Sequence, residues 1–224
     1  MASRHLERIA ALERRRPGAA AILHKTGRLT EPIVQRLWAR PELLQVAAHL
    51  LGSEDVLAHP IWNLRPKTPG RSPLQYDLHQ DAAFWPGEAA AAPVVAAWVP
   101  LVDVDEASGT LRFLLGAHLE ANCSRGSGPE GFAMLRHTPS DAAGWALAAE
   151  GQALAAVLGG STESACESAA AAVAAAARPA VVPRGSVVLF HQLTVHGATP
   201  NAAGRTRWAV DVRYAAAGRD HGMG

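Results

Sequence analysis

The sequence is poor in cysteine, in aromatic residues and in any excess of charge. Its only two cysteines, Cys123 and Cys166, stand far apart in 224 residues. Without a C-x-x-C spacing they argue against a disulfide framework and against a thiolate zinc site. Positive and negative side chains nearly balance, at a formal net charge of +1, so the basic pattern of a nucleic-acid-binding protein is missing. We therefore expect reduced thiols and no nucleic-acid partner.

Long apolar runs are also absent. Hydrophobic residues make up 49% of the sequence, yet no run approaches the roughly 20 uncharged apolar residues that a membrane span needs. The opening segment MASRHLERIAALERRR is too charged for a signal peptide. We expect a cytoplasmic protein without a membrane partner, folded as one domain. The sequence leaves open whether the protein is a monomer or a homodimer.

Helical periodicity marks the beginning of the sequence, and short strands follow. Apolar residues at three-and-four spacing predict helices over 3–16 and 31–51, with Gly52 as a stop. A capping box at Ser164 and Glu167, ahead of an alanine run, predicts a helical insertion within 140–178. β-prone runs predict strands at 56–65, 74–80, 93–102, 110–115, 180–183, 186–195 and 206–214. Because no helices alternate regularly with these strands, they favour an antiparallel sandwich or barrel.

A pair of metal-capable side chains stands in the predicted strand at 74–80. His79 and Asp81 are two positions apart, so in an extended strand they point to one face while Gln80 points to the other. Two ligands rarely fix a metal, and a third must come from elsewhere. His196 is the best candidate because it lies where the strand at 186–195 breaks into a turn. His191 competes with it but lies on the opposite face of that strand.

Five segments together resemble one enzyme family. They are HQD, WVPL, SGTLRFLLGAH, VLFHQLTVHGATPN and RTRWAVDVRY, and over residues 43–214 they are similar to the phytanoyl-CoA dioxygenase family of iron(II)/2-oxoglutarate oxygenases. His79, Asp81 and His196 fit the family's His-x-Asp and distal histidine, and Arg207 fits an arginine that follows the distal histidine by eleven residues. Ala117 departs from the pattern because the family usually has a serine there.

The resemblance implies an α+β, mainly β fold. Its core would be a double-stranded β-helix, also called a jelly roll or cupin-like fold, with N-terminal helices packed on one sheet and a helical insertion or lid. The single domain 1–224 would then divide into a helical part at 1–55, jelly-roll strands at 56–118 and 180–214, and the insertion at 119–179.

The resemblance also implies a chemistry. His79, Asp81 and His196 would bind Fe(II), and 2-oxoglutarate and O2 would take part in hydroxylating a C–H bond of a small metabolite, with release of succinate and CO2. A halogenase would lack the carboxylate of Asp81, so oxygenation is favoured. A zinc- or other metal-dependent cupin-like hydrolase or isomerase could use the same three ligands.

Other residues are candidates for binding the organic ligands. Arg207 offers a guanidinium fork for the far carboxylate of 2-oxoglutarate, although Arg205 shares its strand parity and that strand face could simply be solvated. Trp98 and Thr194 could contact the cosubstrate, with core packing as the alternative for Trp98. The tentative substrate-pocket residues are Gln80, Trp85, Asn63 and Arg65, with packing or a solvated strand edge as the alternatives.

Overall fold

Antiparallel strands make up most of the described structure. The computed structural model describes residues 32–58, 62–70, 78–84, 92–115, 138–140, 144–146 and 176–218. The main sheet has the order β1-β10-β3-β8, with β2 also paired to β10. Its strands are β1 (Val56–Ala58), β2 (Asn63–Lys67), β3 (Val94–Pro100), β8 (Val188–His191) and β10 (Arg207–Ala216). The named strand pairs are all antiparallel, as the sequence predicted.

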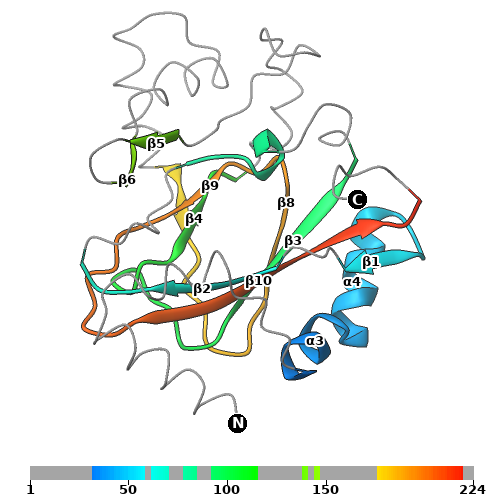
Figure 1. Cartoon of the computed structure of the whole chain (residues 1–224), viewed down its shortest axis with the longest axis horizontal. Helices are drawn as coiled ribbons and strands as arrows, with labels where there is room; N and C mark the ends of the chain where they lie inside the picture. The colour runs from blue at the N-terminus through cyan, green and yellow to red at the C-terminus, as the bar shows by residue number, and fades with distance from the viewer. Residues whose placement is uncertain are drawn as a thin grey trace, which may run out of the picture.

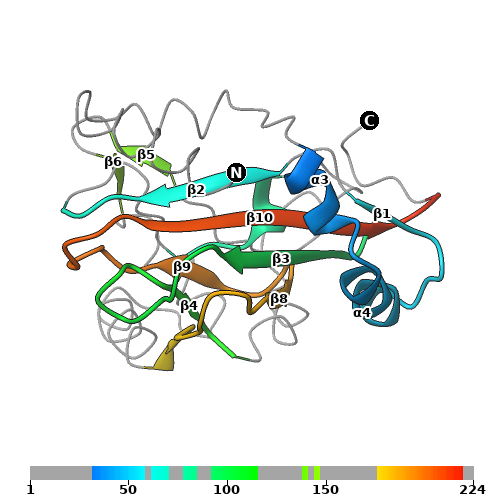
Figure 2. The same cartoon turned by 90° about the horizontal axis from the view of Figure 1, so that it is seen from below.

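A second, smaller sheet lies beside the first (Figures 1 and 2). It has the order β7-β4-β9, with β7 at Arg178–Pro179, β4 at Leu111–Phe113 and β9 at His196–Ala198. Figures 1 and 2 show β4 and β9 side by side, on the opposite side of the barrel from β2. In a separate two-stranded sheet, β5 (Thr138–Ser140) pairs antiparallel with β6 (Gly144–Ala146).

The central strand β10 has one apolar face and one polar face. Trp208, Val210, Val212 and Tyr214 alternate along it and pack with Leu43 and Ala47 of helix α4 (Pro41–Leu51) in one buried cluster. The intervening side chains therefore point to the other side of the sheet, since side chains alternate along a strand. Figure 2 shows β10 between β2 and β3, and Arg207 and Asp211 on the second face are buried, so this face also points into the interior.

The helix predicted over 31–51 is two helices. α3 (Pro32–Trp38) ends before Arg40, whose backbone is extended at φ −63° and ψ 128°, and α4 begins at Pro41. A residue that precedes proline is pushed out of the helical region, which explains the break. The predicted stop is confirmed, because Gly52 takes the left-handed conformation at φ 60°. The predicted helix at 3–16 lies outside the described residues.

Several strand predictions are wrong in their boundaries. The strand expected at 56–65 is the separate strands β1 and β2, and most of the strand expected at 74–80 lies outside the described residues. The strand expected at 186–195 ends at His191, where a turn carries the chain into β9 of the second sheet. Most of 140–178, including the alanine run, also lies outside the described residues. Within the described ranges, no helix combines the length and the apolar character that crossing a membrane requires.

Candidate active site

A backbone bridge brings the first and last predicted ligands together. The N–H of His79 donates to the carbonyl of His196 at 2.8 Å, and the N–H of His196 donates to the carbonyl of His79 at 2.9 Å. Residues that exchange both hydrogen bonds in this way stand directly opposite each other and project to the same side. Their imidazole rings are 4.4 Å apart between centroids. Two segments more than a hundred residues apart in sequence thus present adjacent imidazoles.

Asp81 supplies the third group of this cluster. It begins a short 3-10 helix, η1 (Asp81–Phe84), so the prediction that it shares a strand with His79 is wrong. The turn nevertheless brings its carboxylate back to the rings: Oδ1 lies 3.6 Å from Nε2 of His79 and 3.9 Å from Nε2 of His196. One ligand atom from each residue lies within 4.8 Å of the others, and all three residues are buried.

The His196 ring is oriented and neutral. A backbone carbonyl can only accept, so the 2.9 Å contact with the carbonyl of Thr194 places a hydrogen on Nδ1. The other ring nitrogen, Nε2, therefore carries the lone pair, and it faces Asp81. Burial, and then the electrostatic interaction with His79, lowers the pKa of His196 to about 4. The aromatic rings of Phe113 and Phe190 lie 5.9 and 4.5 Å from the imidazole and hold it in an apolar environment.

Asp81 is ionised although it is buried. Burial alone would raise the pKa of its carboxyl group, but the Arg213 guanidinium and the two imidazoles hold that pKa well below 3.8. A carboxylate oxygen and an imidazole lone pair therefore face each other at neutral pH. Two acceptors repel unless a cation lies between them, so the donor set fits a metal ion.

The spacing of these atoms also fits a single ion. Two atoms that each bind a first-row metal at about 2.1 Å lie about 3 Å apart at a right angle and about 4 Å apart when opposite. The separations of 3.6 and 3.9 Å fall within that range. Two imidazoles and one carboxylate leave further positions open on a six-coordinate metal such as Fe(II), which is the pattern of non-haem iron oxygenases.

Arg207 forms a buried cationic site in the barrel interior. Only 3% of it is exposed, so the alternative that it lies on a solvated face is wrong. Nε and Nη2 donate to the carbonyl of Gly109 at 3.2 and 3.0 Å, and Nη1 donates to the carbonyl of Arg65 at 3.3 Å. The guanidinium also lies 5.2 Å from the ring centre of Trp98, a cation–π distance.

This arrangement leaves Arg207 able to bind an anion. A guanidinium has five N–H groups, and the three bonds to carbonyls leave two without a partner among the described residues. Burial, and then the positive charge of Arg65, lowers the pKa of Arg207 to about 10, so it remains charged at neutral pH. Arg205, the alternative anchor, has a side chain that is 55% exposed and paired with Asp105.

The remaining predicted residues have different surroundings. Asn63 and Arg65 face the interior and bind Asp211, so the alternative of a solvated strand edge is wrong. Gln80 is fully buried, and its Nε2 donates to the carbonyl of Leu193 at 2.7 Å, which indicates a role in holding the turn between β8 and β9. Thr194 is 8% exposed and lies in that turn. Trp85 lies outside the described residues.

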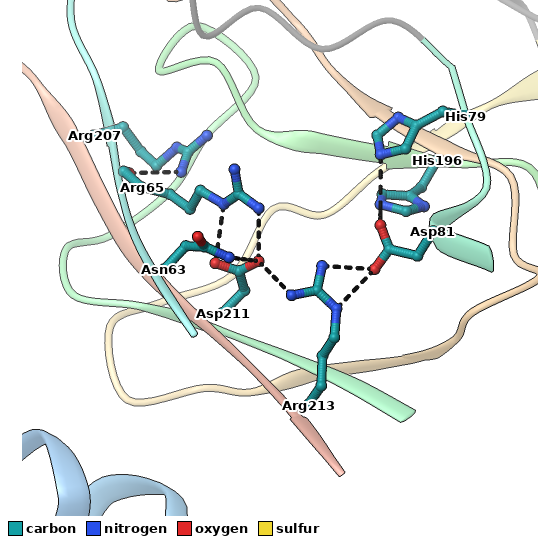
Figure 3. Close-up of polar contacts among 8 residues, drawn as sticks. All are labelled: Asn63, Arg65, His79, Asp81, His196, Arg207, Asp211 and Arg213. Atoms are coloured by element: carbon teal, nitrogen blue, oxygen red, sulfur yellow. Dashed lines mark hydrogen bonds and ion pairs between the residues drawn. The ribbon is translucent and has the colours of Figure 1, made fainter. Parts of the chain in front are cut away.

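Sequence reasoning missed three charged residues of the interior. Arg213 donates to Asp81 Oδ2 through Nη2 at 2.8 Å and through Nε at 3.2 Å. Asp211 lies between Arg65 and Arg213, and Lys67, which is 1% exposed, is the strand partner of Arg207. The available signal was their strand parity, since Arg213 and Asp211 share the face of Arg207. Figure 3 shows the resulting line of polar side chains from Arg65 to the imidazoles.

Comparison with protein families identifies the family to which the chain belongs. The family model described as phytanoyl-CoA dioxygenase (PhyH) matches residues 13–209. The chain belongs to the phytanoyl-CoA dioxygenase family. No curated protein is similar enough to the sequence to count as a relative.

Solved structures with the same fold include proteins of nogalamycin biosynthesis. The non-haem α-ketoglutarate-dependent carbocyclase SnoK of nogalamycin biosynthesis is 23% identical, with a TM-score of 0.55 over 84% of this chain and 60% of that chain. The epimerase SnoN, in complex with Fe3+, α-ketoglutarate and nogalamycin RO, is 20% identical, with a TM-score of 0.55 over 96% of this chain and 85% of that chain. EvdO2 from Micromonospora carbonacea var. aurantiaca, complexed with 2-oxoglutarate, is 21% identical, with a TM-score of 0.52 over 84% of this chain and 64% of that chain.

These similarities confirm the mainly β, cupin-like fold expected of the phytanoyl-CoA dioxygenase family. The chain spans about three fifths of the length of several of these structures. The helical lid expected at 119–179 stays a prediction.

Proposed function

We propose that the protein is an Fe(II)- and 2-oxoglutarate-dependent oxygenase that hydroxylates a C–H bond of a small molecule. The observation that carries the proposal is the convergence of two imidazoles and a carboxylate, at separations of 3.6 and 3.9 Å, within a barrel that also holds the partly unpaired guanidinium of Arg207. The proteins of the same fold whose structures contain 2-oxoglutarate support it.

In this proposal, four side chains have defined tasks. Nε2 of His79, Nε2 of His196 and Oδ1 of Asp81 bind the iron, and the two open N–H groups of Arg207 bind the far carboxylate of 2-oxoglutarate. Bound iron, with 2-oxoglutarate and O2, would supply the oxidising power for the reaction, and succinate and CO2 would be released.

The surroundings of Arg207 prepare it for that task. Cζ of the guanidinium lies over the ring of Trp98, and the carbonyl of Gly109 accepts hydrogen bonds from two of the guanidinium N–H groups. Both contacts fix the plane of the guanidinium before the anion arrives, so less conformational entropy is lost on binding. We further propose that Thr194, whose backbone carbonyl contacts Nδ1 of His196, contributes a hydrogen bond from its hydroxyl to the cosubstrate.

Hydroxylation is the finer part of the proposal. Structures of the same fold are described as an epimerase and a carbocyclase, so the fold supports more than one oxidative outcome. Asp81 favours oxygenation over halogenation because its carboxylate fills the position that a halide would need. The substrate that we propose is a small metabolite, amphiphilic or apolar.

Anaerobic addition of Fe(II) and 2-oxoglutarate to the metal-free protein tests this function. We expect a visible charge-transfer band that requires both components, and succinate formation when O2 is admitted. Arg205→Ala is the matched control, since Arg205 is exposed and lies outside the barrel interior, and it should show the same band. Protein that binds Fe(II) but shows no band with 2-oxoglutarate would contradict the proposal and would favour a zinc-type hydrolase or isomerase.

A further inference from the structure

We propose that Arg213 is a positioning residue that makes Asp81 a one-oxygen metal ligand, and that Asp211 and Arg65 hold Arg213 in place. This inference rests on the proposed function, because it concerns the same metal. It assigns a task to three charged side chains of the interior that bind neither the metal nor, in our proposal, 2-oxoglutarate.

The contacts of Arg213 distinguish the two oxygens of Asp81. Nη2 and Nε of Arg213 both donate to Oδ2, at 2.8 and 3.2 Å. The other oxygen, Oδ1, faces Nε2 of His79 and Nε2 of His196. The guanidinium therefore occupies one oxygen and presents the other toward the imidazoles. Rotation of the carboxylate to bind a metal through both oxygens would break two charge-assisted hydrogen bonds.

Arg213 is itself held from its other side. Its Nη1 lies 3.5 Å from Oδ2 of Asp211. Asp211 in turn accepts two hydrogen bonds from the Arg65 guanidinium: Nε donates to Oδ1 and Nη2 donates to Oδ2, both at 2.9 Å. Asn63 also donates to Oδ2, at 3.4 Å. Figure 3 shows these groups as a continuous row that leads from β2, across β10, to the carboxylate beside the imidazoles.

The backbone of β10 and β2 explains why these side chains lie next to one another. Asp211 and Arg213 are two positions apart on β10, so they project from the same face of the strand. Asp211 is also the direct strand partner of Asn63. The side chains of Arg213, Asp211 and Asp81 are only 11%, 8% and 10% exposed, so water screens their attraction weakly. Each charge in the row has opposite charges beside it, which offsets the cost of burial.

A one-oxygen carboxylate has a consequence for the metal. A carboxylate that binds through one atom fills a single coordination position, and with two imidazoles it leaves three of six positions open. Two of these are needed for a bidentate 2-oxo acid and one for O2. Holding Oδ2 away from the metal thus keeps the third position available.

Metal binding, rather than turnover, tests this role. Metal-free protein is titrated with Co(II), whose absorption spectrum reports its ligands, and with Fe(II) under anaerobic conditions. Arg213→Met removes the donors and the charge, Arg213→Lys keeps the charge but loses the fork, and Asp211→Asn weakens the support of Arg213. Arg205→Met removes an exposed arginine and serves as the control. The midpoint of thermal unfolding is measured for every variant.

We expect Arg213→Met to weaken metal binding about 10- to 100-fold and to shift the Co(II) absorption bands. Arg213→Lys and Asp211→Asn should weaken binding by smaller factors, and Arg205→Met should leave it unchanged. A folded Arg213→Met protein with the metal affinity and Co(II) spectrum of the wild type would overturn the inference, even if its thermal midpoint fell, because Arg213 would then be purely structural.

The outcomes also separate this inference from the proposed function. If Arg213→Met does not fold, Arg213→Lys decides alone, and wild-type affinity with a wild-type spectrum in that variant overturns the inference. If the wild-type protein binds neither Co(II) nor Fe(II), the proposed function fails together with it. If the wild type binds the metal and the Arg213 variants bind it equally well, only the role of Arg213 fails.

Discussion

Replacing Arg207 gives the sharpest test of how the barrel would recognise 2-oxoglutarate. Beyond the bonds to the carbonyls of Gly109 and Arg65, two of its N–H groups have no partner in the described part of the chain. A hydrogen bond between charged groups contributes about 1.5–3 kcal/mol, so two such bonds contribute at least about 3 kcal/mol. Because each 1.4 kcal/mol is a factor of ten, Arg207→Ala should weaken 2-oxoglutarate binding by roughly 150-fold or more.

A lysine at this position separates charge from geometry. Arg207→Lys keeps a cation but not the planar fork, and we expect a loss of about one hydrogen bond, or roughly tenfold in affinity. Arg207→Ala also removes the hydrogen bonds from the guanidinium to the carbonyls of Gly109 and Arg65, which should lower the free energy of unfolding by about 1–3 kcal/mol. Binding is therefore measured well below the midpoint of thermal unfolding.

The assay is an anaerobic titration of the Fe(II)-loaded protein with 2-oxoglutarate, followed by the visible charge-transfer absorption. The affinity for Fe(II) alone should be unchanged in both variants, because Arg207 does not contact the three metal-binding side chains. Arg205→Ala should bind 2-oxoglutarate normally. The reasoning would be refuted if Arg207→Ala reached saturation at the wild-type concentration, and a selective loss in Arg205→Ala would identify Arg205 as the anchor instead.

Three further predictions concern other positions. Asp81→Gly removes one of the three converging ligand atoms, so we expect succinate production to be abolished in an assay with Fe(II), 2-oxoglutarate and O2; wild-type turnover would exclude Asp81 as a ligand. Gly109→Ala places a Cβ 2.8 Å from Cδ of Lys67 at a φ of 78°, and we expect urea unfolding to show a loss of about 1–3 kcal/mol, which an unchanged midpoint would contradict. Burial raises the pKa of Tyr214 from 10.0 to about 12 while its hydroxyl donates to the carbonyl of Trp38. The unfolded chain therefore loses this proton first, so its contribution to stability is complete below pH 10 and is lost as the pH rises toward 12. Unfolding in urea should show a smaller alkaline loss for Tyr214→Phe than for the wild type, and equal losses would refute this account.

The three residues of the candidate metal site could be predicted because their signal is local. His79 and Asp81 form a short motif, and His196 stands at an abrupt change from an apolar run to a turn. The local structure around them could not be predicted in the same way. Asp81 begins a 3-10 helix rather than ending a strand, and the run at 186–195 is divided by a turn in which the ring of His191 accepts the N–H of Leu193. Those features depend on hydrogen bonds between distant segments, such as the bridge between His79 and His196.

The charged interior was hidden for a different reason. Arg207, Asp211 and Arg213 alternate with apolar residues along β10, and this pattern is the same for a strand with one solvated face. Only the pairing of β10 with β2 and β3, and the packing of α4 on its apolar face, shows that the charged face points inward. The sequence contains the alternation, but which face is covered is decided by the tertiary structure.

The two faces of β10 also limit how this protein can change during evolution. An insertion or deletion of one residue ahead of Arg207 would exchange the faces, moving Trp208 and Val210 into the barrel and turning the charged row against α4. A single such event would abolish ligand recognition and expose the main apolar contact at once. We therefore expect length variation among homologues to fall in the turns that flank this strand and to spare the strand itself.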